Sequence, residues 1–205
     1  MDINYQFFGT FAKKYYKNTI LLDIVLMVLT LGLLAIYKSA IVMLVAYFLV
    51  YPYLIQTKRE RLLKPFIIAS FVALAWVITS QQLYNYNIES LSIMGLDVFP
   101  FFAWATGLFA LYLLYSYIEN KIKPKTIGGK LAIFISIYWP LLIFVETIAY
   151  HFFNIKNIET VAYSGLPLCD CIHAPGWMQA SYFILGIVFL VILLHFPKLQ
   201  AQPES

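Results

Sequence analysis

The chain contains six long apolar runs, and these constrain its fold more than any other feature. They cover residues 20–36, 40–55, 63–81, 99–118, 131–152 and 177–196. A transmembrane helix needs about 20 apolar residues to cross the hydrocarbon layer of a membrane. The run at 40–55 is short for a full crossing and has Pro52 near its end. We therefore predict an all-α fold, a polytopic bundle of six transmembrane helices that forms a single integral membrane domain.

Composition supports this class and excludes others. Hydrophobic residues make up 62% of the 205 residues and charged residues only 12%, whereas soluble domains have about 45–50% and about 25%. The low charge also argues against a disordered chain, and two cysteines are too few for a disulfide scaffold. The net charge of +4 comes from basic residues between the spans, so we predict membrane lipids and no nucleic acid as partners.

The distribution of basic residues predicts the orientation of the chain in the membrane. If the N-terminus is cytoplasmic, all 14 basic residues except Lys38 and Lys156 lie on the inner side. Basic residues concentrate on the cytoplasmic side of membrane proteins, and an odd number of spans would mix the two groups. We therefore predict a multi-pass protein of the inner (plasma) membrane with both the N- and C-termini in the cytoplasm.

The chain before the first span is predicted to form a helix on the inner membrane surface. Phe7, Phe8, Phe11 and Tyr15 share one helical face, and lysines lie nearby, a pattern typical of interfacial helices; a disordered tail is the alternative. The predicted segments are the interfacial helix (1–17), a first helix pair (18–62), repeat unit 1 (63–118), repeat unit 2 (131–196) and a cytoplasmic tail (197–205).

The two repeat units are predicted from a similarity at a spacing of about 70 residues. The segment Asn-Ile-Glu-Ser at 87–90 recurs as Asn-Ile-Glu-Thr at 157–160, and Gly-Leu at 95–96 recurs at 165–166. At this spacing, or after a three-residue insertion, Trp76 matches Glu146 and Trp104 matches Trp177. A unit of two spans keeps its orientation, so the repeat is a parallel one. Chance similarity in a biased composition is the alternative.

The repeated segments belong to two loops on the predicted outer side, which we call outer loop 1 (residues 82–98) and outer loop 2 (residues 153–176). Both are rich in Tyr, Ile and Leu and have few charges. Segments of this composition are expected to fold back over the bundle, either as lids over an intramembrane cavity or as plain interfacial caps.

Glu146 is the most costly residue to place in a membrane. It lies about 9 Å inside the outer end of its span at a rise of 1.5 Å per residue, where a charge costs about 2.5–3.5 kcal/mol. We predict that it faces the bundle interior as a catalytic proton donor or a polar ligand contact. A neutral Glu hydrogen-bonded to a neighbouring helix is the alternative. Asp23 lies near the inner end of the first span and is expected to reach the lipid headgroups.

Outer loop 2 contains a compact group of metal-ligating residue types. Cys169, Cys171 and His173 lie within five residues, a set that suits Cu(I) or Zn²⁺ if His151 or Met178 completes it. On an oxidising outer side the two cysteines instead favour a disulfide. Catalytic redox chemistry is a third alternative, although the spacing is not that of the usual Cys-x-x-Cys motif.

Residues 65–190 also carry a set of motif-like positions in tandem. The first unit has Trp76 in its leading helix, Tyr86-Asn87 and Gly95 in its loop, and Pro100-Phe101-Phe102-Ala103 at the start of the next helix. The second unit has Gly165 and Pro167-Leu168-Cys169-Asp170. This pattern resembles the membrane-bound carotenoid-biosynthesis proteins, namely the heterodimer-type lycopene cyclases and the carotenoid hydratases. The acid pair of the cyclases is missing from the first unit, and the second retains only Asp170.

The resemblance implies a long isoprenoid or carotenoid ligand. Acid-catalysed cyclisation of a polyene needs a carboxylic acid to protonate a double bond, aromatic walls to stabilise the cation and a base to remove a proton. Glu146 and Asp170 are the candidate catalytic acids, and the candidate walls are Trp76, Phe101, Trp104 and Trp177. Ligand binding without catalysis, or a non-catalytic subunit of a larger membrane complex or homo-oligomer, fits the same features. The sequence does not identify a cofactor, which stays unknown.

Overall fold

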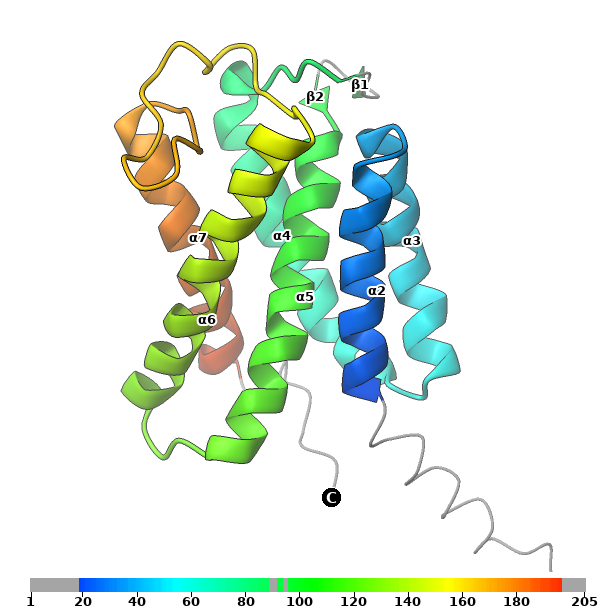
Figure 1. The fold of residues 1–205 in the computed structure, drawn as a ribbon. Coiled ribbons are helices and arrows are strands. Elements are labelled where there is room, and N and C mark those ends of the chain that lie inside the picture. Colours follow the sequence, from blue (N-terminus) through cyan, green and yellow to red (C-terminus); the bar gives the residue numbers. More distant parts are fainter. Residues whose placement is uncertain (1–18, 89–91, 94–95, 197–205) are drawn as a thin grey trace, which may run out of the picture.

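The computed structural model describes residues 19–88, 92–93 and 96–196. The described chain is helical, apart from short connecting turns, two loops and a hairpin of two-residue strands (Figure 1). The long elements are α2 (Thr19–Leu34), α3 (Ser39–Gln56), α4 (Leu63–Ser80), α5 (Phe99–Ile122), α6 (Ile127–Thr147) and α7 (Gly176–His195). The strands are β1 (Ser92–Ile93) and β2 (Leu96–Asp97). The predicted interfacial helix (1–17) and cytoplasmic tail (197–205) lie outside the described residues.

Within the described chain, five helical segments are long and apolar enough to cross a membrane. They are Ser39–Gln56, Glu60–Leu83, Phe99–Ile122, Ile127–Phe152 and Gly176–His195. The run at 40–55, which the sequence marked as short, thus forms a helix of sufficient length despite Pro52. The shorter helix is instead the first, Thr19–Leu34, with 16 residues.

Local sequence explains where the α5–α6 hairpin turns. Helix α5 starts with Pro100 in its first turn and ends at Lys123, whose positive φ of 54° breaks the helix. Helix α6 begins after Thr126, whose hydroxyl accepts a 3.0 Å hydrogen bond from the Gly129 N–H, a typical N-cap.

A π-helical turn, Ile148–Phe152, follows the other end of α6. This form is rare and is frequent at functional sites.

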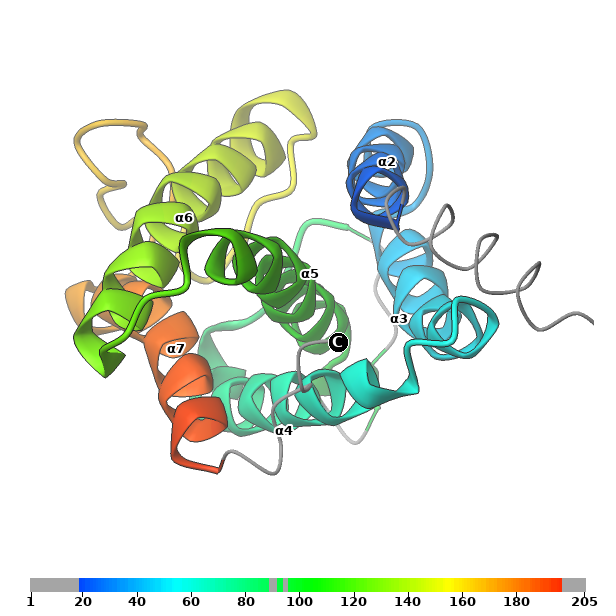
Figure 2. The same cartoon turned by 90° about the horizontal axis from the view of Figure 1, so that it is seen from below.

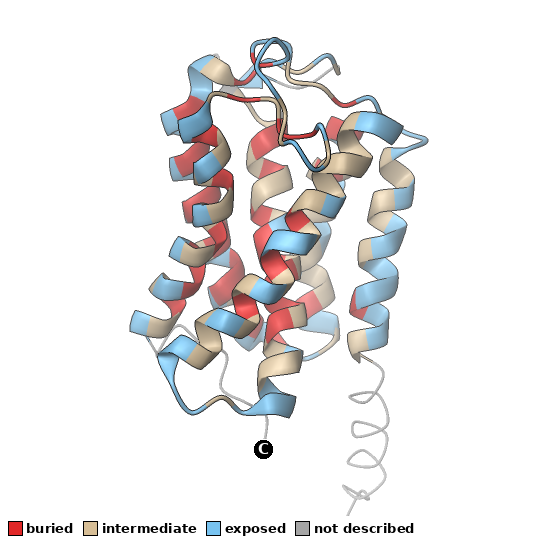
Figure 3. Cartoon of the chain, turned by 60° about the vertical axis from the view of Figure 1, so that its left-hand side comes forward, coloured by how far each residue is buried: buried red, intermediate tan, exposed pale blue. Residues whose placement is uncertain are grey.

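The helices alternate in direction and form two groups around α5. Helix α4 packs against α5 and α7, and α6 also packs against α5 and α7, whereas α2 and α3 pack together on the other side of α5 (Figure 2). Buried residues line the facing sides of α4, α5 and α7, and the outward faces are exposed (Figure 3). The turn between α2 and α3 lies at the end of the bundle that carries both outer loops (Figure 1).

Outer loops 1 and 2 fold back over this end of the bundle, as their composition predicts. Tyr84 from the first and Cys171, Ile172 and Ala174 from the second are buried in the main hydrophobic core. The two loops are also joined to each other. The Asn87 N–H donates to the Lys156 carbonyl at 2.9 Å, and the Ile158 N–H donates to the Asn85 carbonyl at 2.6 Å. The described parts of the two loops are thus joined at this end of the bundle.

Helices α6 and α7 pack tightly against each other at Gly186. A Cβ atom at Gly186 would lie 2.4 Å from the Tyr138 ring, whose hydroxyl donates to the Tyr182 carbonyl. We expect Gly186→Ala to lower the unfolding free energy by about 1–3 kcal/mol, the usual cost of overpacking. Thermal unfolding in detergent measures it. Gly107→Ala in α5 is the matched control, because a Cβ there meets nothing within 4 Å, and it should be neutral or slightly stabilising. Equal melting temperatures for the two variants would contradict the close contact.

Candidate functional site

Most of the aromatic residues that the sequence singled out meet beneath the outer loops. We call Trp76, Tyr84, Trp104, Trp177 and Tyr182 the aromatic cluster. The Trp76 and Trp177 ring centroids are 6.2 Å apart, and those of Trp104 and Tyr182 are 5.0 Å apart. The cluster draws on α4, α5, α7 and outer loop 1, so it joins the two predicted repeat units.

Tyr84 is the centre of the polar contacts in this cluster, and the sequence did not single it out. A short turn at Gln81–Leu83 follows α4 and brings Tyr84 back over the helix end. Its hydroxyl accepts hydrogen bonds from Trp76 Nε1 at 2.7 Å and Trp104 Nε1 at 3.3 Å, and lies 3.1 Å from the Tyr182 hydroxyl. Burial raises the pKa of Tyr84 to about 12, and the nearby Glu146 charge also raises it. The phenol is therefore a neutral donor at physiological pH.

Glu146 acts on this cluster through its charge. Its carboxylate is within electrostatic range of the phenols of Tyr84, Tyr86, Tyr138 and Tyr182. The side chain is half-buried, and no hydrogen bond or ion pair joins it to another residue of the described chain. The predicted alternative, a Glu hydrogen-bonded to a neighbouring helix, is therefore not what the structure contains.

A groove of about 1010 Å³ runs along α6 beneath outer loop 2. Its helix wall extends from Ile135 to Thr147, a length of about 18 Å at 1.5 Å per residue. Much of the lining is apolar and faces outward, since Trp139 is 41% exposed and Phe144 55% exposed. The loop wall consists of Pro167, Leu168, Cys169 and Asp170.

The other two predicted site residues lie apart from Glu146. Asp170 has an exposed side chain in outer loop 2 and lies 3.4 Å from His173 Nε2. It belongs to the groove wall, and no contact joins it to the aromatic cluster. Phe101 points to the opposite side of α5, where its ring centroid lies 5.5 Å from that of Tyr47 on α3. The four predicted walls therefore do not form one surface.

Cys169 and Cys171 form a disulfide, which is the alternative that the oxidising side favoured. Their sulfurs are not thiolates in this state, and both His173 ring nitrogens contact carbonyl oxygens, of Tyr163 at 2.7 Å and of Asp170 at 3.1 Å. No group of three metal-ligating side chains occurs among the residues described. Gly165 is also fixed here, because a Cβ would lie 2.9 Å from His173 Nε2. The predicted metal set would need this loop to be reduced and rearranged.

The disulfide makes a direct prediction about thiol content. We expect no thiol to react with maleimide in the denatured, unreduced protein, and both cysteines to react after reduction. Cys169→Ser is the matched control and should expose one reactive thiol, at Cys171, only after denaturation, because that side chain is fully buried. Labelling of two thiols without reductant would contradict the disulfide.

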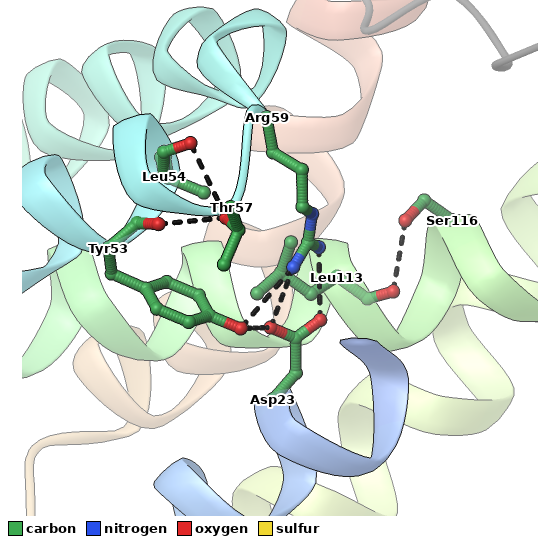
Figure 4. Close-up of polar contacts among 7 residues, drawn as sticks. All are labelled: Asp23, Tyr53, Leu54, Thr57, Arg59, Leu113 and Ser116. Carbon is green, nitrogen blue, oxygen red and sulfur yellow. Dashed lines mark hydrogen bonds and ion pairs between the residues drawn. The ribbon is translucent and has the colours of Figure 1, made fainter. Parts of the chain in front are cut away.

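Asp23 occupies a different environment from the predicted one. It does not reach the headgroups but lies 3% exposed between α2 and the α3–α4 turn. Both its oxygens accept hydrogen bonds from Arg59, at 2.9 and 3.0 Å, and one also accepts from the Tyr53 hydroxyl at 2.5 Å (Figure 4). This cluster is at the end of the bundle opposite the outer loops, so it holds helices together far from the candidate site.

Comparison of the chain with protein-family models, curated proteins and solved structures finds no match in any of the three. The functional argument therefore depends on the site itself.

Proposed function

We propose that the protein is an integral inner-membrane protein that binds a long isoprenoid or carotenoid-like lipid beneath its outer loops, with Glu146 as its proton-transfer group. The observation that carries the proposal is the position of an unpaired carboxylate next to an apolar groove. A carboxylate at membrane depth is costly, and such residues usually serve a ligand or a proton path.

The groove has the size and lining expected of a lipid site. Ligand pockets commonly have volumes of about 300–1,000 Å³ and mainly apolar walls, and this groove has about 1010 Å³. Its length of about 18 Å is more than half of the hydrocarbon thickness of a bilayer. Its outward-facing wall of Trp139 and Phe144 would contact a chain that lies parallel to α6.

Glu146 connects the groove with the aromatic cluster. It comes seven residues after Trp139, which lines the groove, and four after Leu142, which is buried. At helical spacing these positions put Glu146 on the boundary between the two faces of α6. A protonated Glu146 would donate its proton to a double bond of a bound polyene, and the aromatic rings would stabilise the resulting cation. Loss of another proton from the ligand to a base would complete the reaction.

Binding is tested by purifying the protein from cells that accumulate lycopene and recording the absorption spectrum. We expect carotenoid bands with the unmodified chain and their loss with Ile143→Trp, which fills the groove. Val188→Trp, at a partly exposed position on α7, is the matched control and should retain them. A blank spectrum from the unmodified chain, or equal pigment in both variants, would contradict binding in the groove.

The tandem repeat remains a prediction, and the contact between the loops supports it. Tyr86 and Asn157 form an antiparallel bridge, and Asn157 is the repeat equivalent of Asn87. Helices α4 and α5 would correspond to α6 and α7, and the packing of α4 on α7 and of α5 on α6 is what a two-fold relation between the units requires.

A non-catalytic subunit is the second candidate, and α2 is the feature that favours it. Asp23 is its one buried residue, so most apolar side chains of α2 are available to lipid or to another membrane protein. Size measurement in a mild detergent separates the two candidates. A stable monomer that retains pigment supports lipid binding, and a larger assembly without pigment supports the subunit function.

A further inference from the structure

The disulfide between Cys169 and Cys171 is poorly suited to a purely structural role. It closes a loop that contains a single intervening residue, Asp170. A disulfide stabilises a protein mainly by restricting the unfolded chain, and this effect grows with the length of the loop that it closes. The bond therefore adds little to the stability of outer loop 2.

Hydrogen bonds hold this part of outer loop 2 without the disulfide. The Leu166 N–H donates to the Cys171 carbonyl at 2.8 Å, and the Asp170 N–H donates to the Leu166 carbonyl at 2.8 Å. From α7, Gln179 Nε2 donates to the Ile172 carbonyl at 3.2 Å. None of these bonds involves a sulfur atom. The loop can therefore keep its shape when the disulfide opens, and the two sulfurs stay close enough to rejoin.

The backbone is strained on both sides of Cys171. Asp170 has a φ of 45° and Ile172 a φ of 52°, which is the left-handed region. A β-branched residue such as Ile is a genuine outlier there. Such conformations persist only where the surrounding structure holds them, and they cluster at active sites and switch regions. Their position around one cysteine therefore favours a functional role for the disulfide.

The two cysteines differ in their access to an incoming reactant. Cys169 is partly exposed and belongs to the loop wall of the groove on α6, whereas Cys171 is 0% exposed. The neighbouring Leu168 is 92% exposed, so its side chain covers neither of them. The rate of thiol–disulfide exchange depends on which sulfur is accessible. Cys169 is thus the sulfur that a thiolate attacks, and Cys171 is the leaving sulfur.

We propose that the Cys169–Cys171 disulfide is a thiol–disulfide exchange site that accepts two electrons from a dithiol. A thiolate of the dithiol attacks Cys169 Sγ, the Cys169–Cys171 bond breaks, and Cys171 leaves as a thiolate that takes a proton from water. The second thiol of the dithiol then attacks the mixed disulfide and releases Cys169, which is protonated in turn. The dithiol becomes a disulfide and the protein becomes a dithiol, and the reverse exchange with an oxidised partner restores the starting state. This site does not depend on the ligand proposed for the groove.

The first test is reduction of the folded protein by dithiothreitol in mild detergent, with thiols counted after quenching and denaturation. We expect the rate of reduction to be within about 10-fold of that in denaturing detergent, because Cys169 is accessible in the fold. The reduced protein should melt within about 3 °C of the oxidised one, because so short a loop adds little stability. Oxidised glutathione should then restore the disulfide. Reduction that occurs only after unfolding, or loss of the fold on reduction, overturns the proposal.

The second test identifies the sulfur that is attacked. Cys171→Ser and Cys169→Ser are a matched pair, since each retains one thiol. With oxidised glutathione, Cys171→Ser should form a mixed disulfide at Cys169 at least about 10-fold faster than Cys169→Ser forms one at Cys171, which is buried. Equal rates, or a faster reaction at Cys171, overturn the assignment.

The unmodified protein provides the same information if a variant does not fold. Acid stops exchange during the reaction with reduced glutathione, because it protonates the thiolates. Mass spectrometry of the peptides should then find glutathione on Cys169. Glutathione on Cys171, or on neither cysteine, contradicts the proposed site.

Discussion

Replacing Asp23 with alanine should lower the unfolding free energy of the protein by about 3–5 kcal/mol, because the Arg59 guanidinium would remain buried without its counter-charge. The two side chains are 2% and 10% exposed and form two hydrogen bonds. A buried charge without a partner cannot recover its hydration. Thermal unfolding in detergent measures the loss.

Two further variants make this test specific. Lys130→Gln removes a partly exposed ion pair with Glu119 and should cost about 0–1 kcal/mol. The double variant Asp23→Leu with Arg59→Met removes both buried charges and should recover much of the lost stability, because apolar replacement of a buried pair is often neutral. A double variant as unstable as Asp23→Ala would show that the charges themselves are not the cause.

Replacing Glu146 with glutamine should reduce any acid-catalysed conversion of a polyene by about 10²–10⁴-fold, the usual contribution of a general acid. Glutamine keeps the shape of the side chain but cannot release a proton. The measurement is the pigment composition of cells that produce lycopene together with the unmodified chain or with Glu146→Gln.

Glu60→Gln is the matched control, since this residue is exposed at the other end of the bundle and its loss should leave the pigments unchanged. Equal conversion by Glu146→Gln and the unmodified chain would rule out Glu146 as the acid. If the unmodified chain converts nothing but retains bound pigment, the protein binds its ligand without transforming it.

The apolar helices and their positions could be predicted because both follow from local sequence. Long apolar runs form helices wherever they are placed in a bilayer, and each predicted run corresponds to one helix. The helix lengths could not be predicted as well. Pro52 does not end α3, and the first run forms only 16 helical residues. Helix ends depend on capping and neighbours, which periodicity does not encode.

The site could be predicted only in part, because side-chain partners depend on tertiary packing. The matching of Trp104 with Trp177 indicated residues that the fold brings to one cluster. Phe101 was predicted as a wall of the same site, but its ring packs against Tyr47 on another face of α5. Tyr84 was missed because the chain has 16 tyrosines, and nothing in its local sequence distinguishes a buried network member from an interfacial residue.

Asp23 shows a further limit of reasoning from charge counts. Arg59 was assigned to the inner loops as a topological charge, but it turns inward and is 9% exposed. A basic residue that the charge count places in an inner loop can thus be part of the packed interior. Its partner Asp23 lies 36 residues away in the sequence, and no local pattern links the two.

The hydrogen bonds between outer loops 1 and 2 determine the direction from which a ligand would arrive. Entry between the two loops would require the Asn87–Lys156 and Ile158–Asn85 bonds to break. The groove on α6 lies on an outward face of the bundle instead, so under the proposed function a lipid would enter sideways from the membrane without crossing an aqueous phase. The rate of loading should then follow the concentration of ligand within the bilayer, and a soluble carrier would have to deliver its cargo to the membrane before this protein could take it up.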